Sequence, residues 1–261
     1  YDRMAAYFAS IGVAGARMMR QTASVQVCLD VASDAALQWR VLNAAALLGV
    51  AIFASSPRYA GALTDEQSVR AGAWRALDPL RTGLPYGDAS ADAYLRFALE
   101  APSIFHRADD GSYAPFGELL ATGRAKTDDW DAHLSTLFPE VRPRGYLEVR
   151  SADAIDPAYY AAPLALLAGI SYHAPALRAA AELLGSPSDE RLAAAGRAGL
   201  RDAALARDAV ALVDIALAGC TALGPEFFAP RDLDEARAFF DRYTRTARAP
   251  ADDARERVAA V

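Results

Sequence analysis

The chain has 261 residues, a formal net charge of −6, 53% hydrophobic residues and 23% charged residues. This composition excludes disordered and fibrous proteins, and an acidic balance without a basic tract argues against a nucleic-acid partner. The longest apolar run, residues 41–54, has 14 residues, which is short of the about 20 that a membrane span needs. The two cysteines are too far apart in sequence for a disulfide framework or a zinc site, so we expect a cytoplasmic protein without a membrane partner.

The first predicted elements are a helix, a strand and a long second helix. Apolar residues at helical spacing predict a helix over residues 1–11, and because the chain opens inside it, with its first methionine at position 4, we expect that an N-terminal portion is missing. Residues 21–31 alternate between apolar and polar side chains, as in a strand with one buried face. Ser33 is a suitable N-cap for a central, mostly apolar helix over residues 34–54.

The middle of the chain mixes polar loops with short elements. We expect loop material over residues 57–90, a helix over 91–100, and a hairpin formed by 103–107 and 112–114. A helix is predicted from Thr127 to about residue 138, and a second alternating strand over residues 144–151.

The remainder of the chain is predicted to be helical. The expected helices, which precede a frayed tail ending at Val261, cover about 158–172, 175–184, 188–198, 203–223 and 232–247. The strands therefore fall in residues 1–153 and the helices gather in residues 154–261, which is the pattern of an α+β fold. No linker separates these parts, so we expect one domain over residues 1–261.

The polar faces of the two predicted strands carry the side chains best suited to chemistry. Gln26 lies on the polar face of the first strand, with Ser24 beside it, and Glu148 and Arg150 share one face of the second. A carboxylate and a guanidinium on one sheet face suit a metal–phosphate site, because oxygen ligands hold Mg²⁺ and arginine neutralises phosphoryl charge. A solvated sheet face with an ordinary Glu–Arg pair explains the same spacing.

Other candidate residues are explained by structural roles. His133 lies within a predicted helix, where a packing or surface histidine is the simplest interpretation. Cys28 has no evident histidine partner, which favours a structural thiol over a nucleophile. Trp74 fits a core position, although a tryptophan between arginine-bearing loops could also line a pocket. The sequence contains none of the common glycine-rich phosphate loops.

Five segments, in order, resemble one family. They are Met18 to Asp30, Phe53 to Pro57, Ser68 to Gly83 with Arg70, Trp74, Asp78 and Arg81, Asp129 to Arg142, and Tyr146 to Asp153. This series is similar to the plant-type and actinobacterial glutamate–cysteine ligases. The resemblance covers residues 18–153, whereas the C-terminal helices resemble the family only in character.

The resemblance implies a glutamine-synthetase-like fold, here a partial antiparallel sheet followed by a large helical part. It implies a ligase that uses ATP and Mg²⁺ to phosphorylate the γ-carboxylate of glutamate. The cysteine amine then attacks, giving γ-glutamylcysteine for glutathione or ergothioneine synthesis. The implied partners are the small-molecule substrates glutamate and cysteine.

The resemblance also implies roles for individual residues. Those that would act on the substrate or the transferring phosphate are Arg70, Arg81 and Arg150. Those that would bind the nucleotide cofactor are Ser24, Gln26, Trp74 and Arg142. Gln26 and Glu148 would hold the metal.

Departures from the family pattern keep other functions open. Cys28 replaces the usual asparagine, Ser55 replaces the asparagine before Ser-Pro, and Ser151 stands where glycine is common. The family's early strands, with several metal-binding glutamates, have no counterpart here, so we expect this chain alone to be inactive. The alternatives are a carboxylate–amine ligase of the same superfamily that uses another amine, and a non-catalytic binding module.

Overall fold

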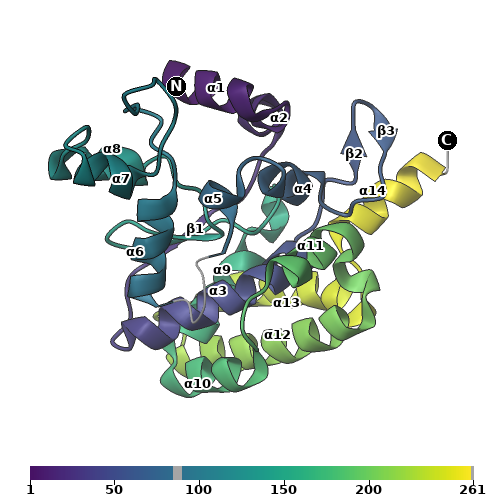
Figure 1. Ribbon diagram of the computed structural model, residues 1–261. Helices are drawn as coiled ribbons and strands as arrows, with labels where there is room; N and C mark the ends of the chain where they lie inside the picture. The colour runs from purple at the N-terminus through teal and green to yellow at the C-terminus, as the bar shows by residue number, and fades with distance from the viewer. Residues whose placement is uncertain (85–89, 260–261) are drawn as a thin grey trace.

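The protein has an α+β architecture, seen in a computed structural model that describes residues 1–84 and 90–259 (Figure 1). The α-helices are α1 (Asp2–Ile11), α2 (Ala14–Gln21), α3 (Ala35–Ile52), α4 (Val69–Arg75), α5 (Pro79–Thr82), α6 (Ala91–Glu100), α7 (Phe116–Ala121), α8 (Trp130–Leu134), α9 (Ala161–Tyr172), α10 (Ala174–Leu183), α11 (Asp189–Ala198), α12 (Ala203–Leu223), α13 (Pro230–Arg242) and α14 (Pro250–Ala259). The 3₁₀ turns are η1 (Thr127–Asp129), η2 (Pro157–Tyr159), η3 (Gly199–Arg201) and η4 (Thr244–Thr246). The strands are β1 (Val27–Leu29), β2 (Arg58–Tyr59), β3 (Ala62–Leu63), β4 (Val141–Pro143) and β5 (Leu147–Val149).

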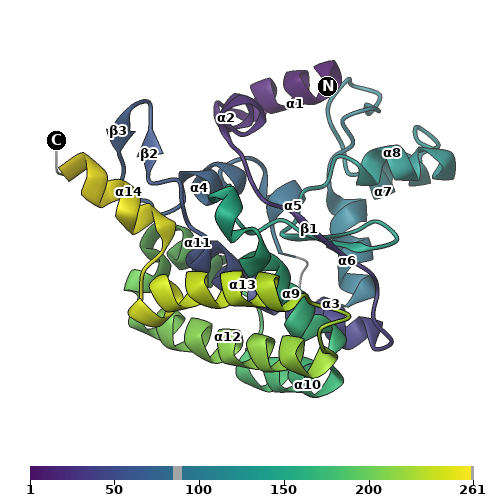
Figure 2. The same ribbon diagram turned by 180° about the vertical axis from the view of Figure 1, so that it is seen from behind.

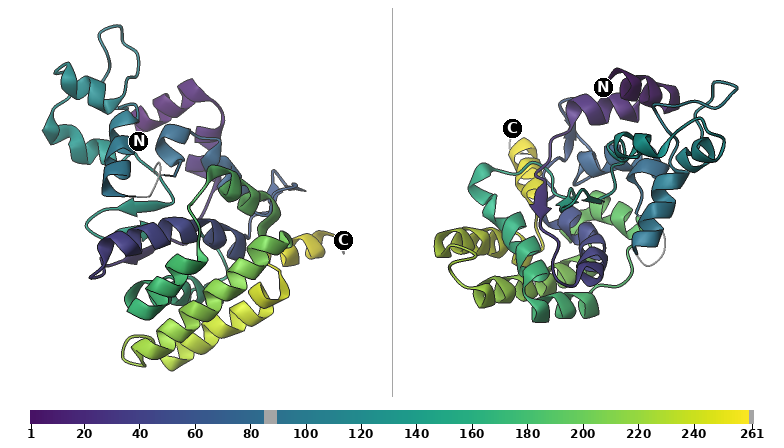
Figure 3. Two further views of the ribbon diagram at one scale, coloured as in Figure 1. Left: turned by 60° about the horizontal axis from the view of Figure 1, so that its bottom comes forward. Right: turned by 90° about the vertical axis from the view of Figure 1, so that its left-hand side faces the viewer.

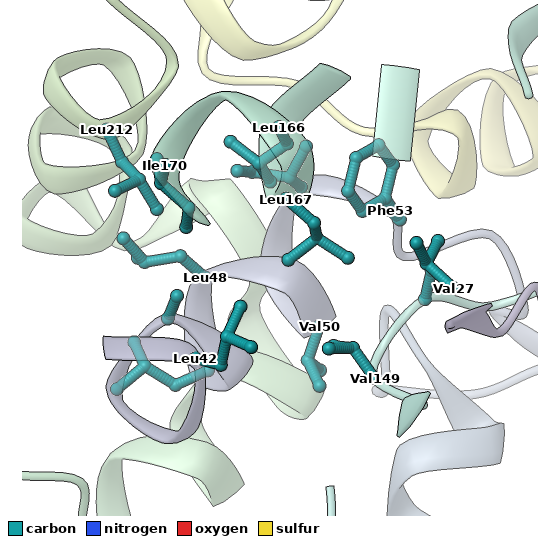
Figure 4. Close-up of a cluster of buried hydrophobic side chains, with 14 of the residues drawn as sticks. Val27, Leu42, Leu48, Val50, Phe53, Val149, Leu166, Leu167, Ile170 and Leu212 are labelled. Carbon is teal, nitrogen blue, oxygen red and sulfur yellow. The ribbon is translucent and has the colours of Figure 1, made fainter. Parts of the chain in front are cut away.

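The main sheet has three antiparallel strands in the order β1–β5–β4. Val149 of β5 is paired with Val27 on one side and with Val141 on the other. Alternation along each strand turns these valines toward the helices, where Val149 lies beside Val50 of α3 and Val27 lies near Phe53 (Figure 4). The opposite face of the sheet is left for polar side chains.

Helix α3 is the central element of the core. Its N-cap is Asp34, whose carboxylate accepts a hydrogen bond from the Leu37 amide at 3.1 Å, so the prediction that Ser33 caps this helix is wrong by one residue. Among the described residues, α3 is the one helix long and apolar enough to cross a membrane, but 78% of it is buried inside the fold. It contacts the sheet, α9, α10, α11 and α12, which explains why it is apolar on nearly all sides.

The C-terminal helices form a layer on the side of α3 away from the polar sheet face. Helices α12 and α13 run side by side, as seen from behind in Figure 2 and in the left view of Figure 3, and both pack against α9. Helices α9 and α12 are in close backbone contact: a Cβ added at Gly169 would lie 2.1 Å from the Ala216 carbonyl oxygen, and one at Gly219 would lie 2.2 Å from the Gly169 carbonyl oxygen. Glycine at both positions lets the two backbones touch.

The predicted strands are longer than the observed ones. The strand expected over residues 21–31 is reduced to Val27–Leu29, because α2 continues to Gln21 and the next residues make only an isolated bridge from Ser24 to Asp153. The strand expected over residues 144–151 is reduced to Leu147–Val149, because Gly145, at a φ of 79°, turns the chain back to form the unpredicted strand β4. The alternating pattern in the sequence therefore identified which side chains face the core. The length of each strand depends instead on where hydrogen bonding to the neighbouring strand stops.

Three predictions in the middle of the chain are corrected. The loop expected over residues 57–90 contains the hairpin β2–β3 and the short helices α4 and α5, whose N-caps are Ser68 and Asp78. The hairpin expected at residues 103–114 has no strands; the main-chain bonds there include one from the Ser103 amide to the Ala114 carbonyl. The helix expected from Thr127 to about residue 138 starts as η1 and ends at Leu134.

Two predictions near the C-terminus are also corrected, whereas the helices at 91–100 and 203–223 are confirmed. The helix expected over residues 232–247 is α13 followed by η4. The prediction of a frayed tail is wrong for residues 250–259, which form α14, and residues 260–261 lie outside the described residues. Asp252 anchors this helix: it accepts hydrogen bonds from the buried Gln67 side chain at 2.9 Å and from Arg201 at 2.7 Å.

Candidate functional site

The polar face of the main sheet brings residues from all three strands into one row. Glu148, in the central strand, is paired with Cys28 of β1 and with Arg142 of β4. Because residues directly opposite each other in a sheet project to the same side, these three side chains share the face that the core valines leave. The strand periodicity in the sequence correctly separated Glu148 from its apolar neighbours.

Glu148 is a buried carboxylate shared by two arginines. Only 7% of the residue is exposed. Its Oε2 atom accepts hydrogen bonds from Arg142 Nε at 2.8 Å and from Arg150 Nη1 at 2.8 Å, and Arg142 Nη2 lies 2.7 Å away. No described residue bonds to Oε1, so one carboxylate oxygen is left for a ligand.

The two arginines are held from the side by aromatic rings and an amide. The Arg150 guanidinium lies 4.9 Å from the centre of the Trp74 ring, and its Nη1 donates to Gln26 Oε1 at 3.3 Å. Arg142 lies 5.9 Å from the Phe138 ring, which makes an edge contact with Trp74. Burial, followed by the nearby Arg150 charge, lowers the pKa of Arg142, while Glu148 acts in the opposite direction. The pair of guanidiniums is therefore rigid and poorly solvated.

Arg70 lies next to this group and braces the chain at the end of β5. It is 4% exposed and donates to the carbonyl oxygens of Arg150 and Ser151, the latter at 3.3 Å. Its Nη1 is 3.8 Å from Asp153 Oδ1. Its guanidinium is 5.8 Å from the Trp74 ring, so Arg70 joins the loop that carries Trp74 to the strand that carries Glu148.

Asp153 is a residue of this region to which sequence reasoning assigned no role. Its carboxylate accepts bonds from the hydroxyls of Ser56 at 2.7 Å and Ser68 at 2.8 Å, and from the Ser55 amide at 2.9 Å. It thereby fixes the α3–β2 connection and the start of α4 against the end of β5. An aspartate soon after a strand was the available signal, but its serine partners are about 85 to 98 residues away in sequence.

Arg81 belongs to a different cluster. It has no solvent exposure, its Nε lies 3.1 Å from Asp78 Oδ2, and its Nη1 donates to Thr136 Oγ1 at 2.8 Å. The Tyr7 ring lies 4.4 Å from its guanidinium, and the Tyr7 hydroxyl donates to Asp78 at 2.6 Å. Burial, with help from Asp78, raises the pKa of Tyr7 to about 12, so this hydroxyl stays protonated. The structure does not bring Arg81 to Glu148.

Ser24 and Cys28 lie on the more open side of the site. Ser24 Oγ accepts a bond from the Gln26 amide at 3.3 Å. Cys28 is exposed, and partial burial and the nearby Glu148 charge raise its pKa, which disfavours the thiolate. The expectation that Cys28 is a half-buried structural thiol is wrong, because the residue is exposed; its raised pKa agrees only with the expectation that it is not a nucleophile.

The structural interpretation of His133 is confirmed. The residue is fully buried, its Nε2 lies 2.7 Å from the Ala98 carbonyl oxygen, and its ring stacks on Phe116 at a centroid distance of 4.2 Å. Burial lowers its pKa to about 4, so the ring is neutral at physiological pH and donates to that carbonyl.

The site offers oxygen donors that suit a divalent metal ion, but it offers few of them. No cluster of three or more His, Cys, Asp or Glu side chains suited to a metal occurs among residues 1–84 and 90–259. The available donors on the polar face are Glu148 Oε1 and the Gln26 amide oxygen. Carboxylate and amide oxygens fit Mg²⁺, which is commonly held by one or two carboxylates together with water and substrate phosphates. The donor set therefore fits the chemistry of this ion without enclosing it.

Comparisons with known proteins agree with the motif order. The model of the family described as glutamate–cysteine ligase family 2 matches residues 1–226. The glutamate–cysteine ligase EgtA of Mycolicibacterium smegmatis is 35% identical over 277 residues, covering 100% of this chain and 63% of that protein. The chloroplastic glutamate–cysteine ligase of Arabidopsis thaliana is 35% identical over 170 residues, covering 59% of this chain and 33% of that protein. The chain thus spans less than two thirds of the curated relatives it matches.

Proposed function

The chain belongs to glutamate–cysteine ligase family 2, and we propose that it is part of an ATP-dependent ligase that joins the γ-carboxylate of glutamate to the amine of cysteine. The proposed route passes through γ-glutamyl phosphate. The observation that carries the proposal is the Glu148 carboxylate, bound through one oxygen by Arg142 and Arg150 and open at the other. The two relatives are both named glutamate–cysteine ligases, which favours cysteine over another amine as the second substrate.

The arginines are proposed to stabilise the charge of the transferring phosphoryl group. Arg142 and Arg150 carry planar guanidiniums that bind phosphate oxygens, and Glu148 and Trp74 hold them in place before the substrate arrives. Positioning and charge stabilisation supply most of the catalysis in phosphoryl transfer, so such a rigid cationic pair suits this step.

Mg²⁺ is proposed to bind through Glu148 Oε1 and the Gln26 amide oxygen. When bound, this ion would neutralise charge on the ATP phosphates. Ser24, Trp74 and Arg142 are proposed to contact the nucleotide from around the same face. Arg70, which bonds to the carbonyls at the end of β5, and Arg81, which is enclosed, are proposed to act by positioning the strand and the loops.

We also propose that the three-stranded sheet is part of a glutamine-synthetase-like sheet, and that residues 1–261 form one catalytic domain. The support for this is an antiparallel sheet that buries one face against α3 and α9 and presents polar side chains on the other. Solving the structure of the protein encoded by the complete reading frame would show whether further strands extend this sheet.

The proposal is tested with protein expressed from the complete reading frame that contains this chain. ADP release in the presence of glutamate and cysteine should fall at least about 100-fold in the Glu148→Gln variant, because the amide is neutral and has one acceptor oxygen, where the carboxylate uses one oxygen for the two arginines and keeps the other for the ion. Glu118→Gln, on the exposed surface of α7, is the matched control and should keep the wild-type rate. A Glu148→Gln enzyme as active as the wild type would contradict the assignment of this site.

The acyl phosphate is tested separately. Hydroxylamine supplied in place of cysteine should be converted to γ-glutamyl hydroxamate, because it intercepts an activated γ-carboxylate. Formation of the hydroxamate in the presence of ATP, and its absence without ATP, supports the phosphorylated intermediate. ADP release with other amines but not with cysteine would favour the alternative carboxylate–amine ligase.

A further inference from the structure

Two serine hydroxyls cap the start of α4. The amide of Arg70, the second residue of this helix, donates to Ser56 Oγ at 3.2 Å. The amide of Ala71, the third residue, donates to Ser68 Oγ at 3.0 Å. A hydroxyl that accepts a bond from a helix amide still has its own proton to donate. Each of these serines therefore needs an acceptor on its other side.

Asp153 is the acceptor for both hydroxyls. Its Oδ2 atom accepts from Ser56 at 2.7 Å, and its Oδ1 atom accepts from Ser68 at 2.8 Å. The residue is 2% exposed, so these bonds are shielded from water. A carboxylate close to a helix N-terminus is favourable, because the helix dipole is positive there. Asp153 therefore caps α4 indirectly, through one hydroxyl on each carboxylate oxygen.

Helix α4 carries two side chains that hold Arg150 in place. Trp74, in the last turn of α4, lies 4.9 Å from the Arg150 guanidinium. Arg70, in the first turn, donates to the carbonyl oxygens of Arg150 and Ser151. Its Nη1 atom also lies 3.8 Å from Asp153 Oδ1. Because α4 has only 7 residues, a shift of its capped end moves Trp74 as well.

Asp153 is also connected to the other side of Arg150. It forms an isolated antiparallel bridge with Ser24, whose Oγ accepts a bond from the Gln26 amide at 3.3 Å. Gln26 Oε1 in turn accepts from Arg150 Nη1 at 3.3 Å. The Arg150 guanidinium is thus bounded by Trp74 and Gln26, and the segments that carry both of these side chains are held by Asp153.

We propose that Asp153 is a positioning residue for the ligase reaction: it fixes α4 through Ser56 and Ser68, and α4 fixes Trp74 against the Arg150 guanidinium. The inference rests on the proposed function, in which Arg150 stabilises the transferring phosphoryl group. Groups that stabilise transition-state charge act best when they are held in place beforehand, and a misplacement of about 1 Å can lower a rate about 100-fold.

The first test follows Trp74 directly in the 261-residue chain. The chain has three tryptophans, so its proton–nitrogen correlation spectrum has three indole signals, which single Trp→Phe variants assign. Asp153→Asn should displace the Trp74 signal and leave the other two in place, because an amide has one acceptor oxygen for two serine hydroxyls. Ser68→Ala should displace the same signal, because it removes one of the two caps of α4 while the carboxylate is kept.

The second test uses protein from the complete reading frame. Asp153→Asn should lower kcat for γ-glutamylcysteine formation at least about tenfold and keep the KM for cysteine within about twofold, because the affected group acts in the transition state. If Asp153 acts through Trp74, the Asp153→Asn/Trp74→Phe double variant should have about the kcat of the slower single variant. Independent effects would multiply instead.

Asp252→Asn is the matched control for loss of a buried, hydrogen-bonded carboxylate. Asp252 is 8% exposed and accepts bonds from Gln67 and Arg201, but it holds α14 rather than α4. This variant should lower the Tm of the protein without displacing the Trp74 signal or changing kcat.

An unmoved Trp74 signal in Asp153→Asn, a displaced signal with wild-type kcat, or multiplying effects in the double variant would overturn the inference. The same criteria apply to Ser68→Ala if Asp153→Asn does not fold. A complete protein that forms no γ-glutamylcysteine would instead refute the proposed function, and the Trp74 signal would still decide whether Asp153 fixes α4.

Discussion

Individual polar residues in this protein are buried in pairs and clusters, and their partners determine what each can do. Glu148 and Arg81 illustrate the two outcomes. The Glu148 carboxylate keeps one oxygen open on a polar sheet face, whereas the Arg81 guanidinium is enclosed by Asp78, Thr136 and Tyr7. Both lie in segments that resemble the family, so position in such a segment does not by itself distinguish a residue at the open face from a structural one.

Replacement of Arg81 should destabilise the fold. In Arg81→Ala the Asp78 carboxylate, 7% exposed, loses its cation and remains buried. Breaking a buried pair in this way costs about 3–5 kcal/mol. Urea unfolding should show that loss, while Arg96→Ala, an exposed arginine on α6, should change the free energy of unfolding by less than about 0.5 kcal/mol. An Arg81→Ala protein as stable as the Arg96→Ala control would contradict this structural role.

His133 should make the stability of the protein depend on pH. Its pKa is lowered from 6.5 to about 4 in the folded state, so between these values the unfolded chain binds a proton that the folded chain does not. The free energy of unfolding therefore falls as the pH is lowered from about 6.5 to about 4, by up to about 3 kcal/mol from this residue. Below pH 4 its contribution stays constant.

The measurement is urea unfolding at pH 7 and pH 4.5. His133→Gln cannot titrate, and its amide can still donate to the Ala98 carbonyl, so this variant should lose less stability between the two pH values than the wild type. His173→Gln, at the start of α10, should retain the wild-type difference. If His133→Gln and the wild type lose the same free energy, protonation of this histidine does not govern the acid response.

At the scale of elements, close backbone contact explains the packing of the C-terminal helices. Helices α9 and α12 touch at Gly169 and Gly219, where neither position has room for a Cβ atom. Glycine within a helix is otherwise unfavourable, so its presence at both positions indicates that the contact compensates for the lost helix propensity. The contact also holds α9, which covers the apolar face of β1.

Gly169→Ala should therefore destabilise the protein even though alanine is the better helix former. The new methyl group would meet backbone atoms of Ala216, which cannot rotate away, and overpacking of this kind costs about 1–3 kcal/mol. Gly185→Ala is the matched control, since a Cβ there meets nothing within 4 Å. Thermal unfolding should show a lower Tm for Gly169→Ala only; equal Tm values in the two variants would be inconsistent with the α9–α12 contact.

For the molecule as a whole, we propose that the described part of the chain supplies only a portion of a metal–phosphate site. Residues 1–84 and 90–259 hold no cluster of three or more metal-ligating His, Cys, Asp or Glu side chains, and the chain spans 63% of the EgtA relative. Phosphoryl transfer depends on fully positioned metal ions. We therefore expect the arginine–carboxylate face to be assembled in this chain without being sufficient for turnover.

The corresponding prediction concerns the 261-residue chain by itself. Incubated with ATP, Mg²⁺, glutamate and cysteine, it should form no γ-glutamylcysteine detectable by mass spectrometry. Protein from the complete reading frame, assayed in parallel, should form it. Turnover by the 261-residue chain would show that its own residues complete the site and that the proposed need for further ligands is wrong.

Much of the fold could be predicted from local patterns, because helix periodicity and strand alternation report which side chains are buried. The helices at 91–100 and 203–223, the apolar central helix and the Glu148 face all follow from spacing of this kind. Strand ends, the β4 strand and the α14 helix did not follow from spacing. They depend on partners distant in sequence, such as the bond from Gln67 to Asp252 across 185 positions.

The sequence by itself determined the family, the α+β class and the polar face on which Gln26, Glu148 and Arg150 lie. These features are encoded in motif order and in a two-residue period, which need no knowledge of three-dimensional contacts. Only the tertiary structure separated Arg81 from Arg150, showed Asp153 bonded to three serines, and exposed a cavity between α3, α6 and the back of the sheet. The physical reason is that burial and pairing arise between segments far apart in the chain. The residues around one segment do not indicate which distant segment it will contact.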